Sequence, residues 1–411
     1  MAIHMRPMVQ DFVRSIVEFK DFGKATIEKP LSTSFPDVQM YINEFWTSKQ
    51  RAAHSLHEIS YRACFKPQLP RFFIQRLSRE GDVVYDPFMG RGTTLLEAAL
   101  LGRIPMGCDI NPLSDILLRP RLNLPPIKDV EERLRSLDLD EKTPIREDLL
   151  VFYHPKTLSA LTNLRNYLLE RDAHGGLDAV DQWIRMVATN RLTGHSKGFF
   201  SVYTLPPNQA VSIQSQRRIN EKRGQSPPFR DVRQIILSKS KSLMKDVGSH
   251  TRDQLAKTAA EAQLIVGSSD NTPTIASDSV KLVVTSPPFL NVVDYQLDNW
   301  LRCWFNGMDP GAIGVWKFAN PLKWSQKMTA TFQELRRVLQ PGGCVAFEVG
   351  EIRKSTLLLE QLVIPAAIQA GLTPVMVIIN DQTFTKTSNC WGVDNLRKGT
   401  NTNRIVLLRK D

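Results

Sequence analysis

The chain has 411 residues, of which 42% are hydrophobic and 23% are charged. This balance excludes a mainly disordered chain, and the length suggests two or three structural units. No window approaches the roughly 18 consecutive apolar residues of a membrane span, and residues 1–20 lack the apolar core of a signal peptide. Five scattered cysteines without a C-x-x-C pair favour a reduced, cytoplasmic setting over a disulfide framework.

The first part of the chain predicts the start of a doubly wound sheet. Residues 1–50 show only a weak pattern, from which we expect an arm and a helix. Apolar periodicity predicts a helix over 69–79 and a short strand over 82–85. A glycine-containing loop, a helix over 93–101 and a strand over 104–110 follow. This strand–loop–helix–strand unit with short connections is typical of α/β folds.

The middle of the chain, residues 121–261, is polar and poor in strand signals. Helices are expected near 156–172, 178–192, 229–246 and 252–262. Strand patterns then resume near 264–267, 280–285, 344–349, 373–380 and 404–408. The sequence therefore predicts one α/β catalytic domain, over 51–120 and 262–411, that is interrupted by a mainly helical insert.

The positive charge of the chain is concentrated in that insert. The net charge is +11, and the segment from Arg191 to Lys245 has eleven basic and two acidic residues, a local charge of +9. A local excess of this kind is expected of a surface that binds nucleic-acid phosphates. A solvated basic face with no partner is the alternative, because such faces are common.

The loop after the first strand of this unit, Asp86-Pro-Phe-Met-Gly-Arg-Gly-Thr-Thr94, carries the first chemical signal. Gly90 and Gly92 allow a sharp turn and a close approach by a ligand, and the following helix offers unpaired N–H groups. Asp86 suits an ammonium group better than a pyrophosphate, and Asp109, at the end of the next strand, can accept both hydroxyls of a ribose. An amino-acid end plus a ribose describes S-adenosylmethionine. The alternative is that the two acids only cap a helix and a turn.

This loop closely resembles the cofactor loop of S-adenosylmethionine-dependent DNA methyltransferases that act on exocyclic amines. The similarity continues through Gly107-Cys-Asp-Ile-Asn-Pro112, and Tyr61–Leu69 resembles the segment that closes over the methionine end of the cofactor. Val266–Asn271 resembles the third strand tip, whose acid meets the adenine amino group, although the family more often has Gly-Asp-Ser there. The cofactor-binding residues implied by the resemblance are Phe65, Pro67, Asp86, Phe88, Gly90, Gly92, Thr93, Thr94, Asp109, Ile110, Asn111, Asp270 and Thr285.

The loop Val283-Val-Thr-Ser-Pro-Pro-Phe289 is the most specific signal in the chain. Two prolines stiffen the end of a strand, Ser286 supplies a hydroxyl, and Phe289 supplies a flat face for a base. Acceptors on the N–H groups of an exocyclic amine draw its nitrogen toward sp³ geometry and free the lone pair. A base inside a duplex cannot reach such a loop, so base flipping is expected.

Thr-Ser-Pro-Pro-Phe resembles the catalytic motif of cytosine-N4 methyltransferases. The resemblance implies catalytic roles for Ser286, Pro287, Pro288 and Phe289. Adenine-N6 enzymes more often carry Asp or Asn in place of Ser286. A carbon-5 enzyme needs a cysteine nucleophile just after this strand, and the chain has no Pro-Cys dipeptide. Glu348, in Phe-Glu-Val, is similar to that class's glutamate, but a glutamate on a strand is more often structural.

The order of the two loops, with the basic insert between them, resembles the alpha group of these enzymes. It implies a Rossmann-like seven-stranded methyltransferase sheet, with target recognition in the helical insert. The implied partners are double-stranded DNA and a cognate restriction endonuclease, in a cytoplasmic, prokaryotic restriction–modification system in which the enzyme associates with the nucleoid while it acts. The residues expected to contact DNA are Arg191, His195, Lys197, Arg217, Arg218, Lys222 and Arg223. For His195 a simple turn is an equal alternative.

Three other functions stay open: adenine-N6 methylation by the same architecture, guanine-N2 methylation of RNA, and nucleic-acid binding without catalysis. The two intact chemical loops argue against the last. No obvious appended RNA-binding module is seen, which argues against the second. The spacing of His54, His57 and Cys64 matches no known zinc-finger pattern, so we expect no metal and place these histidines on a helix surface.

Overall fold

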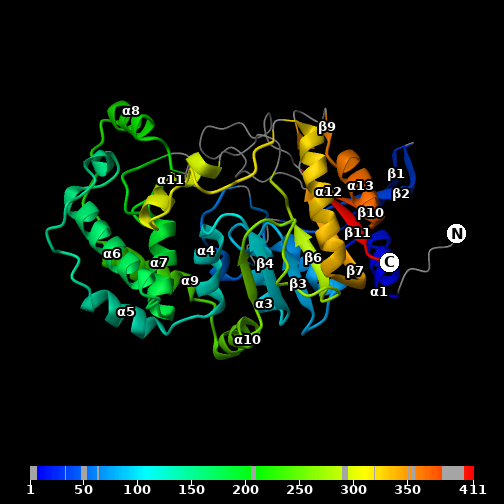
Figure 1. Ribbon diagram of the computed structural model, residues 1–411, viewed down its shortest axis with the longest axis horizontal. Helices are drawn as coiled ribbons and strands as arrows, with labels where there is room; N and C mark the ends of the chain where they lie inside the picture. The colour runs from blue at the N-terminus through cyan, green and yellow to red at the C-terminus, as the bar shows by residue number, and fades with distance from the viewer. Residues whose placement is uncertain are drawn as a thin grey trace.

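The computed structural model describes residues 7–32, 34–47, 53–62, 64–204, 210–288, 295–318, 320–349, 351–352, 357–381 and 402–411. Phe289, which the sequence assigns to the catalytic loop, lies outside the described residues. Figure 1 shows a central sheet covered by helices, with a second group of helices beside one edge of the sheet. None of the helices in the described part of the chain combines the length and apolarity that crossing a membrane requires.

A nine-stranded sheet has the order β1-β2-β10-β11-β7-β6-β3-β4-β5. Its strands are β1 (Ile27–Ser32), β2 (Phe35–Asn43), β3 (Val83–Asp86), β4 (Ile104–Asp109), β5 (Gln263–Val266), β6 (Val280–Thr285), β7 (Leu339–Val349), β10 (Thr373–Asp381) and β11 (Thr402–Arg409). A separate antiparallel pair consists of β8 (Glu351–Ile352) and β9 (Leu357–Leu358).

The sheet has nine strands in the described residues and not the predicted seven, and the two additional strands are the N-terminal hairpin β1–β2. Residues 1–50 contribute a helix, as expected, but also β1 and β2, and β2 pairs in parallel with β10 from Gln39 to Asn43. The residues of β1 are mostly exposed and include Glu28, Lys29 and Pro30. Because this edge strand lacks apolar alternation, its sequence carries no strand signal.

The site is positioned by the parallel half of the sheet. Five adjacent strands are parallel to one another, in the order β5-β4-β3-β6-β7. Strand β11 is antiparallel to both β7 and β10. The carboxyl ends of the parallel strands therefore meet at one edge. The chain order along the sheet reverses between β3 and β6, and such a switch point is where open α/β sheets bind ligands.

Helices cover both faces of this sheet. One face carries α1 (Pro7–Val17), α2 (Gln68–Leu77) and α3 (Thr93–Leu100), and the other carries α12 (Pro321–Val338) and α13 (Glu360–Gln369). Neighbouring residues of one strand enter different cores: Val84 packs with the α1–α2 side, and Tyr85 with the α12–α13 side. This alternation follows from the two-residue period of a strand.

The remaining helices lie around the β5 edge of the sheet, and most of them form a lobe on the left of Figure 1. They are α4 (Leu113–Leu122), α5 (Ile127–Ser136), α6 (Pro155–Ala173), α7 (Ala179–Arg191), α8 (Ile213–Arg223), α9 (Val232–Leu243), α10 (Ser249–Ala259) and α11 (Tyr295–Phe305). Trp183 of α7, Ile236 of α9 and Leu301 of α11 belong to one buried core. The lobe thus includes α11, which follows the second chemical loop in sequence. Helix α8, Ile-Gln-Ser-Gln-Arg-Arg-Ile-Asn-Glu-Lys-Arg, was not predicted because it has no apolar stripe.

Candidate active site

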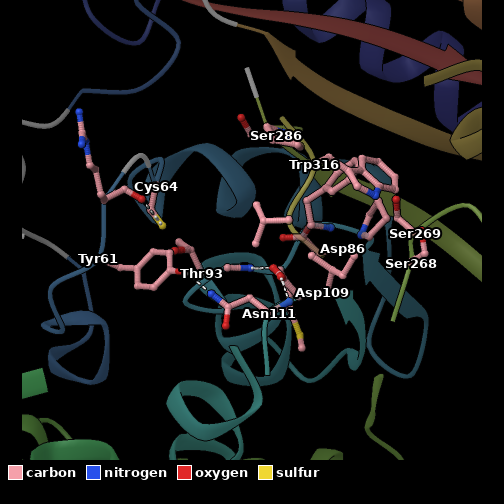
Figure 2. A pocket seen from close by; sticks show the side chains of 18 of the residues that line it. Tyr61, Cys64, Asp86, Thr93, Asp109, Asn111, Ser268, Ser269, Ser286 and Trp316 are labelled. Atoms are coloured by element: carbon pink, nitrogen blue, oxygen red, sulfur yellow. Dashed lines mark hydrogen bonds between the residues drawn. The ribbon is translucent and has the colours of Figure 1, made fainter. Parts of the chain in front are cut away.

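A cavity of about 840 Å³ lies at the carboxyl ends of β3, β4 and β6. Figure 2 shows Tyr61 and Cys64 on one side of it, Ser268, Ser269 and Trp316 on the other, and Asp109 between them. It is lined by Tyr61, Arg62, Cys64, Phe65, Asp86, Pro87, Phe88, Met89, Gly90, Thr93, Asp109, Ile110, Asn111, Gly267, Ser268, Ser269, Ser286, Pro288, Val315 and Trp316.

The loop after β3 can follow its path because of its glycines. Gly90 and Gly92 have φ angles of 50° and 76°, in the left-handed region. A Cβ on Gly92 would also lie 2.7 Å from Cδ1 of Leu118 on α4. Gly92 immediately precedes α3, so this turn aims the N-terminal N–H groups of the helix toward the loop.

Asp86 is buried at the end of β3, with 2% of its surface exposed. The Thr285 hydroxyl donates to its Oδ1 at 2.6 Å, and the N–H of Phe88 donates to the same atom at 3.1 Å. Burial nevertheless raises the pKa of Asp86 to about 7. Burial therefore disfavours the carboxylate form of Asp86, and a cation bound in the cavity would stabilise it.

Asp109 ties the loop to the neighbouring strand. The N–H of Gly90 donates to its Oδ2 at 2.8 Å, and the N–H of Asn111 donates to its Oδ1 at 2.8 Å. Burial raises the pKa of Asp109, and these two backbone bonds oppose that shift. Each carboxylate oxygen has more than one lone pair, so Asp109 can still accept hydroxyls from a ligand.

Arg91, inside the glycine loop, holds the upstream segment over the cavity. Its guanidinium donates to the Ile59 carbonyl at 2.8 Å and to the Thr93 hydroxyl at 3.0 Å. The fully buried Arg121 donates in turn to the carbonyls of Arg91 and Leu56, and burial lowers its pKa to about 9. These two arginines were not predicted as site residues, because the carbonyls they bind are brought near only by folding.

His57 corrects one expectation, since it is buried and not on a surface. Its Nε2 lies 2.8 Å from Oε2 of Glu97, and Arg71 donates to the other Glu97 oxygen at 2.8 Å. Burial lowers the pKa of His57, and the hydrogen bond to Glu97 opposes that shift. The cluster joins α2 and α3 behind the glycine loop, where it supports the cavity wall.

The Ser-Pro-Pro loop after β6 is anchored from two sides. Thr285 binds Asp86 as described, and the indole Nε1 of Trp324 on α12 donates to the carbonyl of Pro288 at 2.9 Å. Ser286 and Pro288 line the cavity, whereas Pro287 is buried and is not among the lining residues. The carbonyl of Pro288 is thus engaged within the protein, and the hydroxyl of Ser286 stays at the cavity.

A second, more polar cavity adjoins the first. The two share Tyr61, Cys64, Phe65 and Ser286, so Ser286 stands at their junction. The lining residues of the second cavity are Ile59, Ser60, Tyr61, Cys64, Phe65, Lys66, Arg91, Ser286, Glu348 and Asn403. Asn403 donates from Nδ2 to Oε1 of Glu348 at 2.9 Å, and the Ser286 side chain also hydrogen-bonds to Glu348. A chain of three polar groups therefore runs from the junction into the second cavity.

The structure brings together eight of the predicted cofactor residues: Phe65, Asp86, Phe88, Gly90, Thr93, Asp109, Ile110 and Asn111. The other five, Pro67, Gly92, Thr94, Asp270 and Thr285, lie outside the lining set. Asp270 forms an ion pair with Lys327 at 2.6 Å, while Ser268 and Ser269 face the cavity in its place. Thr94 donates to the Val284 carbonyl at 3.0 Å and so joins α3 to β6.

Trp316 is a lining residue that could not be predicted from the sequence. Its ring centroid lies 5.8 Å from that of Phe88 in an edge-on arrangement, and the Lys327 ammonium lies 4.3 Å from its ring centre. It belongs to residues 306–320, which precede α12 and have no recognisable motif. Aromatic faces of this kind suit a flat, apolar ligand group.

The residues predicted to contact DNA separate into buried and exposed members. Arg191 is 8% exposed, its guanidinium stacks 4.0 Å above Phe199, and burial lowers its pKa to about 10. His195 is half-buried, and Lys197 is exposed. The four basic residues of α8 are all exposed: Arg217, Arg218, Lys222 and Arg223. Figure 1 shows α8 at the top of the molecule. The short strand β9, which follows β7 in the chain, lies on the same side.

Comparisons with known proteins are consistent with this geometry. A family model described as DNA methylase matches residues 18–114, which is under a quarter of the chain and includes the glycine loop. The chain is 36% identical over 98 residues to "Type II methyltransferase M.MjaII" of Methanocaldococcus jannaschii and 24% identical over 323 residues to "Type II methyltransferase M.BsoBI" of Geobacillus stearothermophilus. These matches cover 24% and 70% of this chain, and 18% and 60% of the relatives.

A relative with a different printed substrate also matches. It is the "tRNA (guanine(10)-N2)-dimethyltransferase" of Methanocaldococcus jannaschii, which is 29% identical over 114 residues, or 25% of this chain and 32% of that protein. The chain therefore spans less than two thirds of the length of each of these relatives.

Proposed function

We propose that the chain is a DNA methyltransferase that transfers a methyl group from S-adenosylmethionine to the exocyclic N4 amine of a flipped cytosine. The observation that carries the proposal is the position of Ser286. It lies where the cavity lined by Asp86 and Asp109 meets a second, polar cavity, so one group can contact both the methyl donor and the acceptor base. The family match over the glycine loop and the type II methyltransferase relatives support methylation of DNA, without distinguishing cytosine from adenine.

The residues of the first cavity fit the two ends of S-adenosylmethionine. Asp86 would bind the ammonium group of the methionine moiety, because a cation offsets the burial of its carboxylate. Asp109 would accept the ribose hydroxyls, as a carboxylate does at the end of the second strand in related folds. Phe88, Ile110 and Trp316 would enclose the adenine ring, near Ser268 and Ser269.

The bound cofactor would supply a methyl group on a sulfonium, which is electrophilic without further activation. The protein then has to position the amine and to raise its nucleophilicity. The Ser286 oxygen accepts a hydrogen bond from the amine, which localises the nitrogen lone pair in line with the methyl group. Methyl transfer would break the carbon–sulfur bond of the cofactor as the carbon–nitrogen bond forms, and the methylated nitrogen would then release one proton to solvent.

The setting that we propose is a type II restriction–modification system, with double-stranded DNA as substrate and an endonuclease specific for the same site as the functional partner. The relatives named type II methyltransferases support this setting. Methylation at N4 removes one amine hydrogen in the major groove, where an endonuclease reads the cytosine. DNA from cells that express the chain should therefore resist that endonuclease.

The product identifies the reaction. The chain is expressed in a host without DNA or tRNA methylation of its own at these atoms, and nucleosides from its DNA and RNA are separated by mass spectrometry. N4-methylcytosine in DNA is the expected product. N6-methyladenine as the only product would mean that the target base is adenine and not cytosine. Methylated guanosine in RNA alone would show that the substrate is RNA and not DNA. Unmodified nucleic acid in both fractions would favour binding without catalysis.

A further inference from the structure

We propose that Ser286, Glu348 and Asn403 form a polar row that reads the edge of the flipped base and selects cytosine. The inference rests on the proposed function, because it concerns the base that would receive the methyl group. The sequence favoured a structural role for Glu348 and assigned no role to Asn403. Both side chains instead line the second cavity, next to the loop that carries Ser286.

The order of the three groups along the cavity wall follows from their contacts. Glu348 is at the carboxyl end of β7 and is 8% exposed. It hydrogen-bonds to the Ser286 side chain, and Asn403 of the adjacent β11 donates to its Oε1 at 2.9 Å. The carboxyl group therefore lies between a hydroxyl and an amide. Of the three groups, the Ser286 hydroxyl is the one that also lines the first cavity.

The edge of cytosine matches this order. It presents the N4 amine as a donor, then N3 as an acceptor, then O2 as a second acceptor. The Ser286 oxygen would accept from the amine, a protonated Glu348 would donate to N3, and the second N–H of Asn403 would donate to O2. The amine then lies at the junction of the two cavities, which is where the methyl group must arrive.

Other bases do not match all three positions. Adenine presents an amine and a ring nitrogen, but a C–H where cytosine has O2, so the donor of Asn403 would be buried without an acceptor. Thymine and guanine present a carbonyl at the first position and an N–H at the second, which conflicts with both Ser286 as acceptor and Glu348 as donor. A site built for a hydrogen bond rejects ligands that lack the partner atom, since its own polar group is left unpaired.

The surroundings of Glu348 support the protonated form. Burial raises its pKa, and the hydrogen bonds from Ser286 and Asn403 oppose that shift only in part. A base that covers the carboxyl would remove further water and would favour the neutral acid again. At the rim of the same cavity, the exposed ammonium of Lys66 is placed to meet a backbone phosphate of the flipped nucleotide.

The test uses the full-length protein and a duplex whose target site has first been mapped by methylation-sensitive sequencing with the wild-type chain. A second duplex carries adenine in place of the target cytosine. Single-turnover methylation rates are measured on both for the wild type and for Glu348→Gln, Glu348→Ala, Asn403→Ala and Asn403→Asp. The exposed changes Glu18→Gln on the α1 side and Gln333→Ala on α12 are matched controls. Calorimetric affinity for S-adenosylmethionine and thermal unfolding show that each variant is folded.

Glutamine keeps a donor at the carboxyl position, so Glu348→Gln should stay within about threefold of the wild-type rate on cytosine, whereas Glu348→Ala should lose at least about 100-fold. Asn403→Ala should slow methylation of cytosine roughly 10- to 100-fold and leave the low rate on adenine unchanged. The ratio of the cytosine rate to the adenine rate should therefore fall by the same roughly 10- to 100-fold. Asn403→Asp keeps the size but removes the donor, and should act in the same direction.

Three results would contradict the proposal that these residues read the base. Equal losses in Glu348→Gln and Glu348→Ala would mean that a carboxylate is needed, not a donor. An Asn403→Ala variant that slows both substrates by the same factor would assign Asn403 a purely structural role. Wild-type rates in all four variants would show that the base does not contact these groups. The proposed function is judged separately, because it fails only if the wild type itself does not form N4-methylcytosine.

Discussion

The cavity at the sheet edge and the surface of α8 both carry charge, but they hold it in different ways. In the cavity, Asp86 is buried and Asp109 is half-buried, and each accepts two hydrogen bonds at distances of 2.6–3.1 Å. On α8 the four basic side chains are exposed. Burial shifts the pKa of a group, and the effect of a buried group depends on its individual hydrogen bonds. Exposed charges contribute mainly through the total charge of the surface, and salt screens them. The two regions should therefore respond differently to mutation, pH and ionic strength.

The largest effect is expected at the junction of the two cavities. Ser286→Ala should slow methyl transfer by about 100- to 1,000-fold, the range found when a preorganised hydrogen-bonding group is removed from a dry site. DNA affinity should change much less, because the interaction strengthens mainly in the transition state. Single-turnover kinetics and equilibrium binding measure the two quantities. A variant with the wild-type chemical rate would assign the activation to the backbone of the loop alone.

On α8, replacing Arg217, Arg218, Lys222 and Arg223 together by glutamine should weaken DNA binding roughly 100-fold at moderate salt. Each lost phosphate contact should flatten the slope of log K against log salt by about 0.9. Binding titrations at several salt concentrations give this slope. Lys257→Gln is the control, because α10 lies at the bottom of the molecule in Figure 1 whereas α8 lies at the top. An unchanged slope would show that the DNA lies elsewhere.

At the ribose end of the cavity, Asp109→Ala should weaken the binding of S-adenosylmethionine by about 1.5–3 kcal/mol, since hydrogen bonds to a charged acceptor would be lost. The change also frees the N–H groups of Gly90 and Asn111. Calorimetry measures the affinity, and the exposed Asp253→Ala on α10 controls for the loss of a surface acid. Equal affinity in the two variants would remove Asp109 from the site.

Substituting two glycines compares the tightness of packing behind the glycine loop with that of the loop before α10. A Cβ on Gly107 of β4 would lie 2.2 Å from Cδ1 of Leu95, whereas a Cβ on Gly248, before α10, would meet nothing within 4 Å. Gly107→Ala should therefore lower the free energy of unfolding by about 1–3 kcal/mol, and Gly248→Ala should not lower it. Denaturant titrations give both values. Equal stabilities would mean that Leu95 and Met89 move aside at little cost.

The last expected effect concerns the pH dependence of cofactor binding. Burial raises the pKa of Asp86 to about 7, so below pH 7 the carboxyl is mostly protonated and must lose its proton to bind an ammonium group. The affinity for S-adenosylmethionine should then fall by up to about tenfold per pH unit as the pH drops from 7 toward 5. Asp86→Asn should flatten this dependence. A flat wild-type profile would show that Asp86 stays ionised in the free protein.

Helices and strands with a clear apolar period were predictable from the sequence. The seven predicted strands all occur, because β3, β6 and β7 are buried and apolar along most of their length. The hairpin β1–β2 and helix α8 were not predictable. The hairpin places the exposed strand β1 at the edge of the sheet and is stabilised by the pairing of β2 with β10, and helix α8 has two isoleucines but no apolar stripe. In both, tertiary contacts replace the local signal.

By itself the sequence determined the two loops that carry the chemistry, since glycine conformations, proline rigidity and a strand-end acid are properties of a few adjacent residues. Only the tertiary structure decided which distant groups complete those loops. Glu348 and Asn403 are 55 positions apart and meet because β7 and β11 are neighbours in the sheet. Trp316, Arg121 and His57 likewise lie at or behind the cavity through packing alone. Their partners are carbonyls, rings and carboxylates from other elements, and no pattern along the chain records such a meeting.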